Sequence, residues 1–224
     1  VQKVDSAGQP SSTTLSESFE WLEINSREQV VVLAAPQQAQ LTGLDFKNLG
    51  QVFTKPLPQP PGFSQYNQIL SRQGRVYALE TTGNIRAFNG QGDQVASATL
   101  SGNHIPLQAT FFGEKLAVVS HEAGNPQKEL RIFNEGLVRL QSYFLGAGNY
   151  SLCQYETDAV AIFRNHQGQC QMSVYNLPDN TLNSMFSLAG ESAGDCEYVS
   201  EGRVVFSTDV ATYIFMLNVG VTPT

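Results

Sequence analysis

Short runs of apolar residues recur along the chain and are separated by turns rich in glycine, asparagine and proline. The clearest example is residues 74–102, GRVYALETTGNIRAFNGQGDQVASATLSG. Its segments 76–80 and 85–89 flank Gly83, and residues 94–100 follow a second glycine-rich break. Runs of β-branched and aromatic residues interrupted in this way predict three short strands joined by tight turns.

The same order of strands repeats along the chain. IRAFN (85–89) recurs as LRIFN (130–134), MSVYN (172–176) and IFMLN (214–218), and a degenerate copy, GLDFK, ends at Lys47. The ends of these copies are 42 to 45 positions apart. The fourth strand repeats as TTLS (13–16), ATLS (98–101), YFLG (143–146) and FSLAG (186–190). Four short strands per repeat of this length are typical of β-propeller blades.

We therefore predict an all-β chain in which residues 1–224 form a single β-propeller domain of five four-stranded blades. The predicted blades are 19–57, 66–100, 107–145, 151–188 and 195–218. Residues 1–16 align with a third and a fourth strand, so we expect residues 9–15 to complete the last blade and close the ring with strands from both termini. A segment of a larger propeller and a β-sandwich are the alternatives, although a sandwich does not predict so constant a period.

One blade resembles a known family. Residues 74–95, GRVYALETTGNIRAFNGQGDQV, look like the blade motif of the PQQ-like and related YncE-type propellers. Glu80, Gly83 and Phe88 match the motif in type, with Phe88 standing where the family often has tryptophan. The resemblance implies a propeller fold and brings no catalytic residue or cofactor with it.

The charge pattern narrows the range of partners. The formal net charge is -7, charged residues make up 15% of the chain, and hydrophobic residues make up 41%. Since no basic run is present, nucleic acid and anionic membrane surfaces are poor partners. A surface low in charge is common in secreted and periplasmic proteins, so we expect an extracytoplasmic location, with a cytoplasmic one left open. Because the chain starts at Val1, we expect that a signal, a tag or further protein preceded it.

Candidate binding residues gather in two kinds of loop. Connections from a fourth strand to the next blade, and from a second strand to a third, emerge on one face of a propeller. The proline-rich connection KPLPQPPGFSQ (55–65) lies there, and its stiff, extended backbone suits a protein partner. The predicted binding face consists of Pro58, Pro60, Pro61, Phe63, Asn103, His104, His121, Glu122, Asn149, Asn165 and His166. The histidines lack metal-ligand spacing, so we expect no metal and no cofactor.

Two functions follow as hypotheses. The first is a non-enzymatic binding or assembly module that engages a protein partner through this loop face. The alternative is a glycan-processing or glycan-binding propeller, which would use Glu23, Glu156, Asp195 and Glu197 on inner strands, because glycoside hydrolysis needs paired carboxyl groups. Whether the chain has an enzymatic activity stays open.

The three cysteines do not form an obvious disulfide framework. Cys153 and Cys196 occupy matching positions in successive first strands. We expect the inner strands of neighbouring blades to lie too far apart for a disulfide, and therefore expect small buried thiols.

Overall fold

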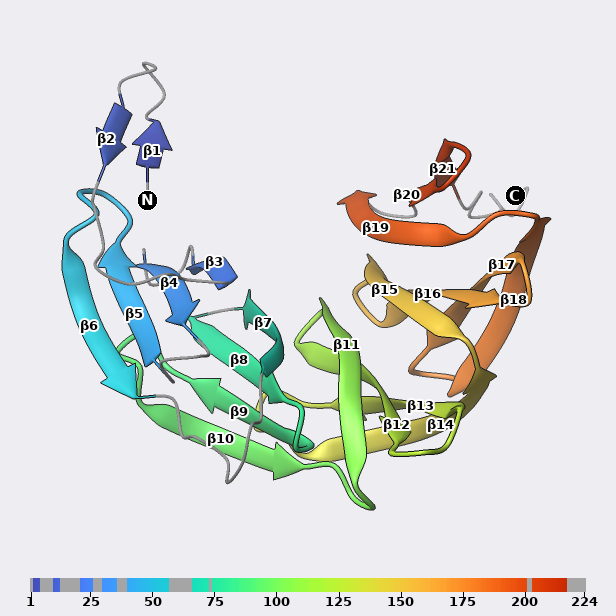
Figure 1. The fold of residues 1–224 in the computed structure, drawn as a ribbon, viewed down its shortest axis with the longest axis horizontal. Coiled ribbons are helices and arrows are strands. Elements are labelled where there is room, and N and C mark those ends of the chain that lie inside the picture. The colour runs from blue at the N-terminus through green and yellow to red at the C-terminus, as the bar shows by residue number, and fades with distance from the viewer. Residues whose placement is uncertain are drawn as a thin grey trace, which may run out of the picture. The chain divides into compact units, whose positions relative to one another are not determined.

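The computed structural model describes residues 2–4, 10–12, 21–25, 30–35, 40–56, 66–72, 74–200 and 203–216. These residues form antiparallel β-sheets that follow one another in chain order (Figure 1). Within these ranges there is no helix that could cross a membrane. The all-β prediction is confirmed.

Four sheets have four strands each, in the order in which the chain forms them. The first contains β3 (Trp21–Asn25), β4 (Val30–Ala35), β5 (Gln40–Asp45) and β6 (Gln51–Pro56). The second contains β7 (Tyr66–Arg72), β8 (Arg75–Glu80), β9 (Asn84–Phe88) and β10 (Gln94–Thr99). The third contains β11 (His104–Phe112), β12 (Lys115–Glu122), β13 (Gln127–Phe133) and β14 (Arg139–Ala147). The fourth contains β15 (Asn149–Glu156), β16 (Ala159–His166), β17 (Gln169–Asn176) and β18 (Thr181–Ala189).

The fifth sheet has three strands among the described residues, β19 (Ala193–Ser200), β20 (Arg203–Thr208) and β21 (Thr212–Met216). A separate pair joins β1 (Gln2–Val4) to β2 (Pro10–Ser12). Residues 10–12 belong to the segment predicted to complete the last blade, and here they pair with β1. Closure of the ring by residues 9–15 therefore stays a prediction.

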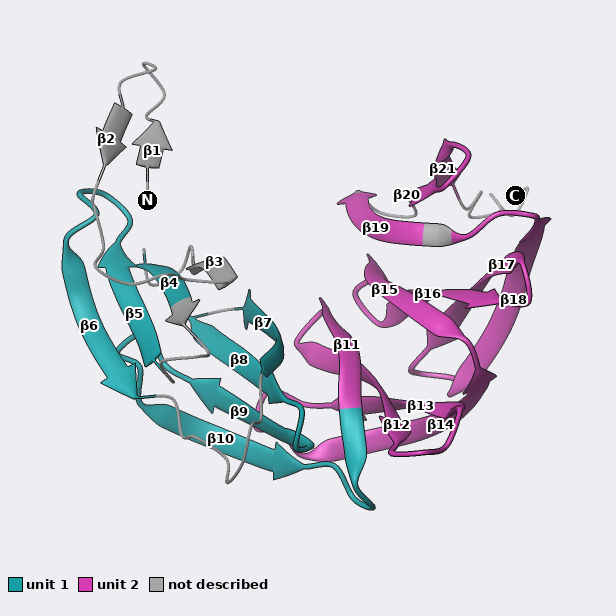
Figure 2. Cartoon of the chain, in the orientation of Figure 1, with its two compact units in different colours: residues 1–105 teal, residues 106–224 magenta. Residues whose placement is uncertain are grey.

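The chain divides into two compact units, residues 1–105 and 106–224 (Figure 2). The prediction of a single domain depends on how these units join, and it stays a prediction. Each unit has its own core between neighbouring sheets. In unit 1, the first two sheets enclose Val30, Val32, Leu41, Tyr66, Ile69, Val76, Ala78 and Phe88, with Phe53 packed against them.

The core of unit 2 lies on both sides of its middle sheet. Val160 and Ile162 of β16 pack toward the β11–β14 sheet. Ala161 and Phe163, which alternate with them, pack toward the β19–β21 sheet. Successive residues of a strand point to opposite faces, so a strand covered on both sides is apolar throughout. This explains why these strands do not alternate between apolar and polar residues.

In the first three sheets, asparagine or aspartate at the end of the third strand builds the turn that leads into the fourth. The Asn89 side-chain oxygen accepts hydrogen bonds from the backbone N–H groups of Gln91 and Asp93, at 3.0 and 2.9 Å. Asn134 accepts one from Val138 N at 2.9 Å. In the first sheet Asp45 does the same for the backbone of residues 47 and 48, at 2.8 and 2.9 Å. The repeat in the sequence matches Lys47 to Asn89. In the structure Asp45, two residues earlier, forms the corresponding turn, so this match is wrong by two residues.

The prediction of free thiols at Cys153 and Cys196 is wrong. The two residues form a disulfide between β15 and β19, with their Cα atoms 5.7 Å apart. The strands approach closely here, since the Ser151 hydroxyl also donates a hydrogen bond of 2.6 Å to the carbonyl oxygen of Gly194. Cys170 is not part of this disulfide and is buried in the same core.

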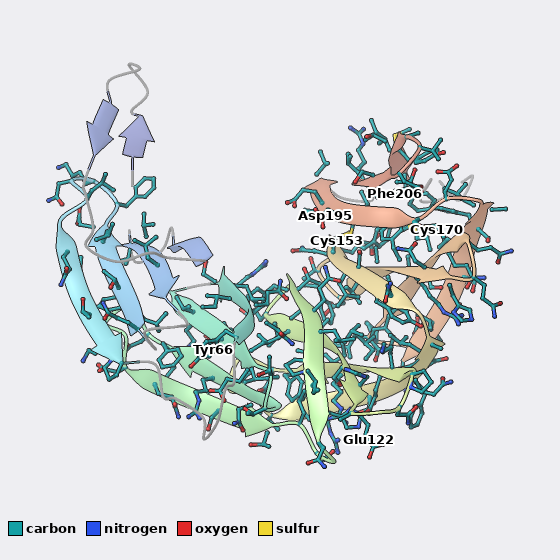
Figure 3. The ribbon with its side chains drawn as sticks, in the orientation of Figure 1. Tyr66, Glu122, Cys153, Cys170, Asp195 and Phe206 are labelled. Carbon is teal, nitrogen blue, oxygen red and sulfur yellow. A yellow bond between two sulfur atoms is a disulfide. The ribbon has the colours of Figure 1, made fainter. Side chains whose placement is uncertain are left out.

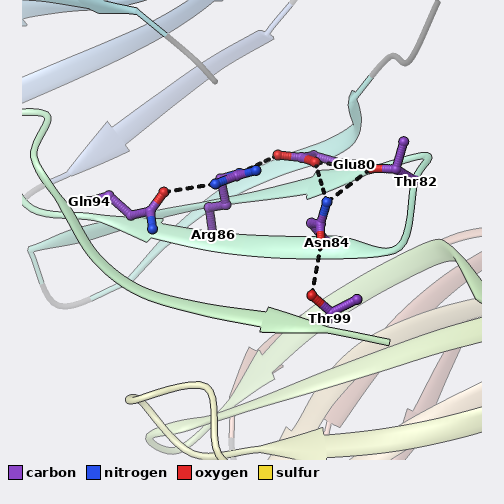
Figure 4. A network of polar contacts seen from close by, with 6 residues as sticks. All are labelled: Glu80, Thr82, Asn84, Arg86, Gln94 and Thr99. Carbon is purple, nitrogen blue, oxygen red and sulfur yellow. Dashed lines mark hydrogen bonds and ion pairs between the residues drawn. The ribbon is translucent and has the colours of Figure 1, made fainter. Parts of the chain in front are cut away.

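Glu80, the acid of the blade motif, is completely buried and organises the turn after β8 (Figure 4). Its carboxylate accepts hydrogen bonds from Thr82 and Asn84, at 3.0 and 2.9 Å, and forms an ion pair with Arg86. Burial, and secondarily the nearby Glu80, raise the pKa of Tyr66 far above its ordinary value. Thr82 and Asn84 hold the turn, and Arg86 links the carboxylate to strand β9, so the cluster has a structural role.

Candidate interaction surface

The predicted loop residues of unit 2 lie at the ends of their strands. His121 and Glu122 end β12, and the His121 ring nitrogen Nδ1 lies 3.4 Å from the carbonyl oxygen of Asn125. Asn149 begins β15 and lies directly opposite Asn165 of β16, so the structure brings these two together. His166 follows at the end of β16. Glu122 and Asn149 are exposed, whereas the other three are half-buried.

The other predicted binding residues belong to unit 1 or lie outside the described part. Asn103 is exposed with a φ of 54°, and His104 is half-buried at the start of β11. Pro58, Pro60, Pro61 and Phe63 lie outside the described residues. No group of three or more histidine, cysteine or acidic side chains suited to a metal ion occurs in the part of the chain that the structure describes.

The candidate glycan-site carboxylates are only partly described. Glu156 ends β15, and Asp195 and Glu197 lie on β19, with all three side chains exposed. A hydrogen bond and a disulfide join β15 to β19 at Ser151 with Gly194 and at Cys153 with Cys196, and neither involves Glu156. The side chain of Glu23 is not among those described.

The fifth sheet has an apolar side that is open to solvent. Val205 is paired with both Glu197 and Ile214, and Arg203 is paired with Met216, so these residues share one face. Ile214 is 67% exposed and Met216 is 61% exposed. This side of the β19–β21 sheet, marked by Glu197, Val205, Ile214 and Met216, is termed the uncovered face.

The repeat shows how unusual this exposure is. By strand pairing, Ala87, Ile132 and Val174 occupy the position of Ile214 in the three preceding sheets, and each is at most 7% exposed. The counterparts of Met216 are Asn89, Asn134 and Asn176, which lie at the ends of the third strands and are half-buried. Sequence reasoning missed this surface because IFMLN has the same apolar pattern as its buried copies.

An aromatic pocket of about 200 Å³ lies on the other side of this sheet, beside β21. Phe206 is stacked between Phe186 and Tyr213, with ring centroids 5.6 and 5.1 Å away (Figure 3 labels Phe206). The Tyr213 hydroxyl donates to the carboxylate of Glu191 at 2.8 Å, and this hydrogen bond raises the pKa of Tyr213. The residues that line the pocket are Phe186, Leu188, Phe206, Tyr213, Ile214 and Phe215.

Comparison with known proteins identifies the fold. No family model matches the chain, and no curated protein matches its sequence. Similar solved structures include Raptor of Chaetomium thermophilum (TM-score 0.67, 12% identity), the Dos1 propeller (0.64, 13%) and the Cps50 (Swd1) β-propeller domain of Myceliophteria thermophila (0.60, 10%). They cover 89%, 96% and 85% of this chain, which spans 19%, 58% and 68% of theirs. The predicted resemblance to β-propeller proteins is confirmed, and at these identities the similarity shows the fold alone.

Proposed function

We propose that this chain is a propeller module that binds or assembles with a protein partner and is not itself a catalyst. The observation that carries the proposal is the exposure of Ile214 and Met216 on the uncovered face. Covering a large apolar side chain stabilises a complex by roughly 1.5 to 3 kcal/mol. Two such residues side by side are therefore a surface suited to a protein partner.

The predicted loop face forms a second part of the proposal. His121, Glu122, Asn149, Asn165 and His166 lie at strand ends in unit 2, where connecting loops can vary without disturbing the sheets. The proline-rich connection 55–65 of unit 1 is a separate candidate for contact with a partner. Its contribution is a proposal that rests on sequence alone.

We also propose that the five sheets are successive blades of one propeller that works outside the cytoplasm. If residues 9–15 completed the fifth sheet in a closed ring, or if further blades followed it in a larger propeller, a neighbouring sheet would cover the uncovered face. The proposed partner site therefore requires an arc of blades that stays open at this face. The disulfide between Cys153 and Cys196 supports an oxidising compartment, because such bonds are rare in the cytosol.

Affinity capture tests the proposed function. The immobilised full chain is compared with the double variant Ile214→Ser/Met216→Ser in an extract of the cells that produce it. Capture of the partner should fall about tenfold or more, as expected when two apolar contacts are lost. The matched control is Val52→Ser/Val95→Ser, which changes valines that are 53% and 46% exposed on the outer strands β6 and β10. Equal capture by wild type and the Ile214→Ser/Met216→Ser variant would contradict the proposal.

A further inference from the structure

We propose that the outer edge of β21 and the aromatic pocket beside it accept an extended, basic segment of a partner protein as the fourth strand of the fifth sheet. This inference rests on the proposed function and specifies how the partner binds. It requires a strand edge that can pair with a peptide backbone, a pocket that can hold the side chains of the peptide, and local charge that complements the charge of the peptide.

The backbone edge is β21. Each of the four complete sheets has a fourth strand paired antiparallel to its third, as β18 pairs with β17. In the fifth sheet, β21 pairs with β20 and no further strand follows among the described residues. An edge strand presents unpaired N–H and C=O groups, which an extended peptide can use by adding a strand.

The pocket defines the side chains of the incoming strand. In the complete sheets, the fourth strand directs residues two apart toward the core, such as Tyr143 and Leu145 of β14 or Phe186 and Leu188 of β18. No described residue forms a fourth strand of the fifth sheet, so no such strand covers Phe206, Tyr213 and Phe215. The pocket lies beside these three side chains. A segment with leucine or phenylalanine at alternate positions would place these side chains in it.

The charge around the fifth sheet is mostly acidic. Asp209 lies in the β20–β21 turn and accepts a hydrogen bond from Ser192 N at 2.9 Å. Glu191 accepts a hydrogen bond of 2.8 Å from the hydroxyl of Tyr213 on β21, whereas Asp195 and Glu197 are exposed on β19, at the opposite edge of the sheet from β21. Among the described residues of the segment 191–216, Arg203 is the one basic residue. The same segment has four described acidic residues, Glu191, Asp195, Glu197 and Asp209. Complementary charge therefore favours a segment with lysine or arginine between its apolar residues.

Peptide binding to the full chain tests the inference. The binding of three short fluorescent peptides is compared by fluorescence anisotropy. In the first, leucine alternates with lysine; in the second, leucine alternates with glutamate; in the third, serine alternates with lysine. The leucine–lysine peptide should bind at least about tenfold more tightly than the other two. Hydrogen exchange at residues 212–216 should slow when it binds. Equal binding of the three peptides, or binding without protection of β21, would overturn the proposal.

Two variants of the chain separate the remaining explanations. Asp195→Asn/Glu197→Gln/Asp209→Asn removes three charges while keeping the shapes, and should weaken the leucine–lysine peptide about fivefold at low salt and little at high salt. Leu15→Asp disrupts the segment predicted to close the ring. If the peptide binds only to the Leu15→Asp variant, this segment occupies the edge and the proposed partner strand is overturned. If none of the peptides binds, the capture result for the Ile214→Ser/Met216→Ser variant is unaffected. Each proposal can therefore be contradicted without the other.

Discussion

The Cα atoms of Cys153 and Cys196 lie 5.7 Å apart, and their disulfide joins residues separated by 43 positions in the sequence. A cross-link over a loop of this length restricts the unfolded chain and adds about 3 to 4 kcal/mol of stability. We expect the double variant Cys153→Ser/Cys196→Ser to lose that much free energy of unfolding in a urea titration. Wild type in a reducing agent should behave like the variant. Wild-type midpoints that do not change on reduction would contradict this prediction.

Tyr155 and Tyr175 are both buried but differ in their hydroxyl groups. The Tyr175 hydroxyl donates to the side-chain oxygen of Asn180 at 2.9 Å, whereas that of Tyr155 has no hydrogen-bond partner among the described residues. A buried polar group without a partner costs about 1 to 3 kcal/mol. Tyr155→Phe should therefore raise the free energy of unfolding, and Tyr175→Phe should lower it by about 1 kcal/mol. Chemical denaturation of both variants measures the difference, and a loss of stability in Tyr155→Phe would refute the assignment.

Stability should fall at alkaline pH. Burial, with a smaller effect of Glu156, raises the pKa of Tyr155 to about 12. Since an unfolded tyrosine titrates near about 10, the folded chain holds this proton more tightly. Ionisation of Tyr155 therefore leaves the stability unchanged below pH of about 10 and lowers it as the pH rises toward about 12, because the folded state disfavours the charged phenolate. Tyrosinate absorbance and circular dichroism should change together over this range, and Tyr155→Phe should shift the transition to higher pH.

Gly113 allows two neighbouring sheets to approach at their turns. It has a φ of 53°, and a Cβ atom there would lie 2.4 Å from the backbone oxygen of Thr157. Gly113→Ala should cost about 3 kcal/mol, from backbone strain together with this clash. Gly124 is the matched control, because its φ is 81° and a Cβ atom there would meet no other atom within 4 Å. Gly124→Ala should cost only about 1 kcal/mol in the same denaturation experiment.

The sheets could be predicted from the sequence because their signals are local. Val160, Ile162 and Phe163 are apolar on both faces of one strand, and such runs recur at a nearly constant interval. The error of two residues at Lys47 arose where the copy is degenerate and aspartate replaces the usual asparagine. The periodic pattern gives the order of strands more reliably than the residue at which each one ends.

Features that depend on neighbouring sheets could not be predicted in this way. The pairing of Cys153 with Cys196 depends on how closely β15 and β19 approach, which no pattern within either strand records. Ile214 occupies the same strand position as Val174, but Val174 packs against the following sheet and is 7% exposed, whereas Ile214 is 67% exposed. The loop-face residues stay predictions, since their role depends on a partner.

The turns formed by Asp45, Asn89 and Asn134 have a consequence for the order in which the protein folds. Each turn is held by hydrogen bonds between residues no more than four positions apart, so it needs no contact with another sheet. A hairpin with such a turn can form within microseconds, before the chain makes its distant contacts. The third and fourth strands of the first three sheets can thus act as independent starting points, and no single sheet has to form first.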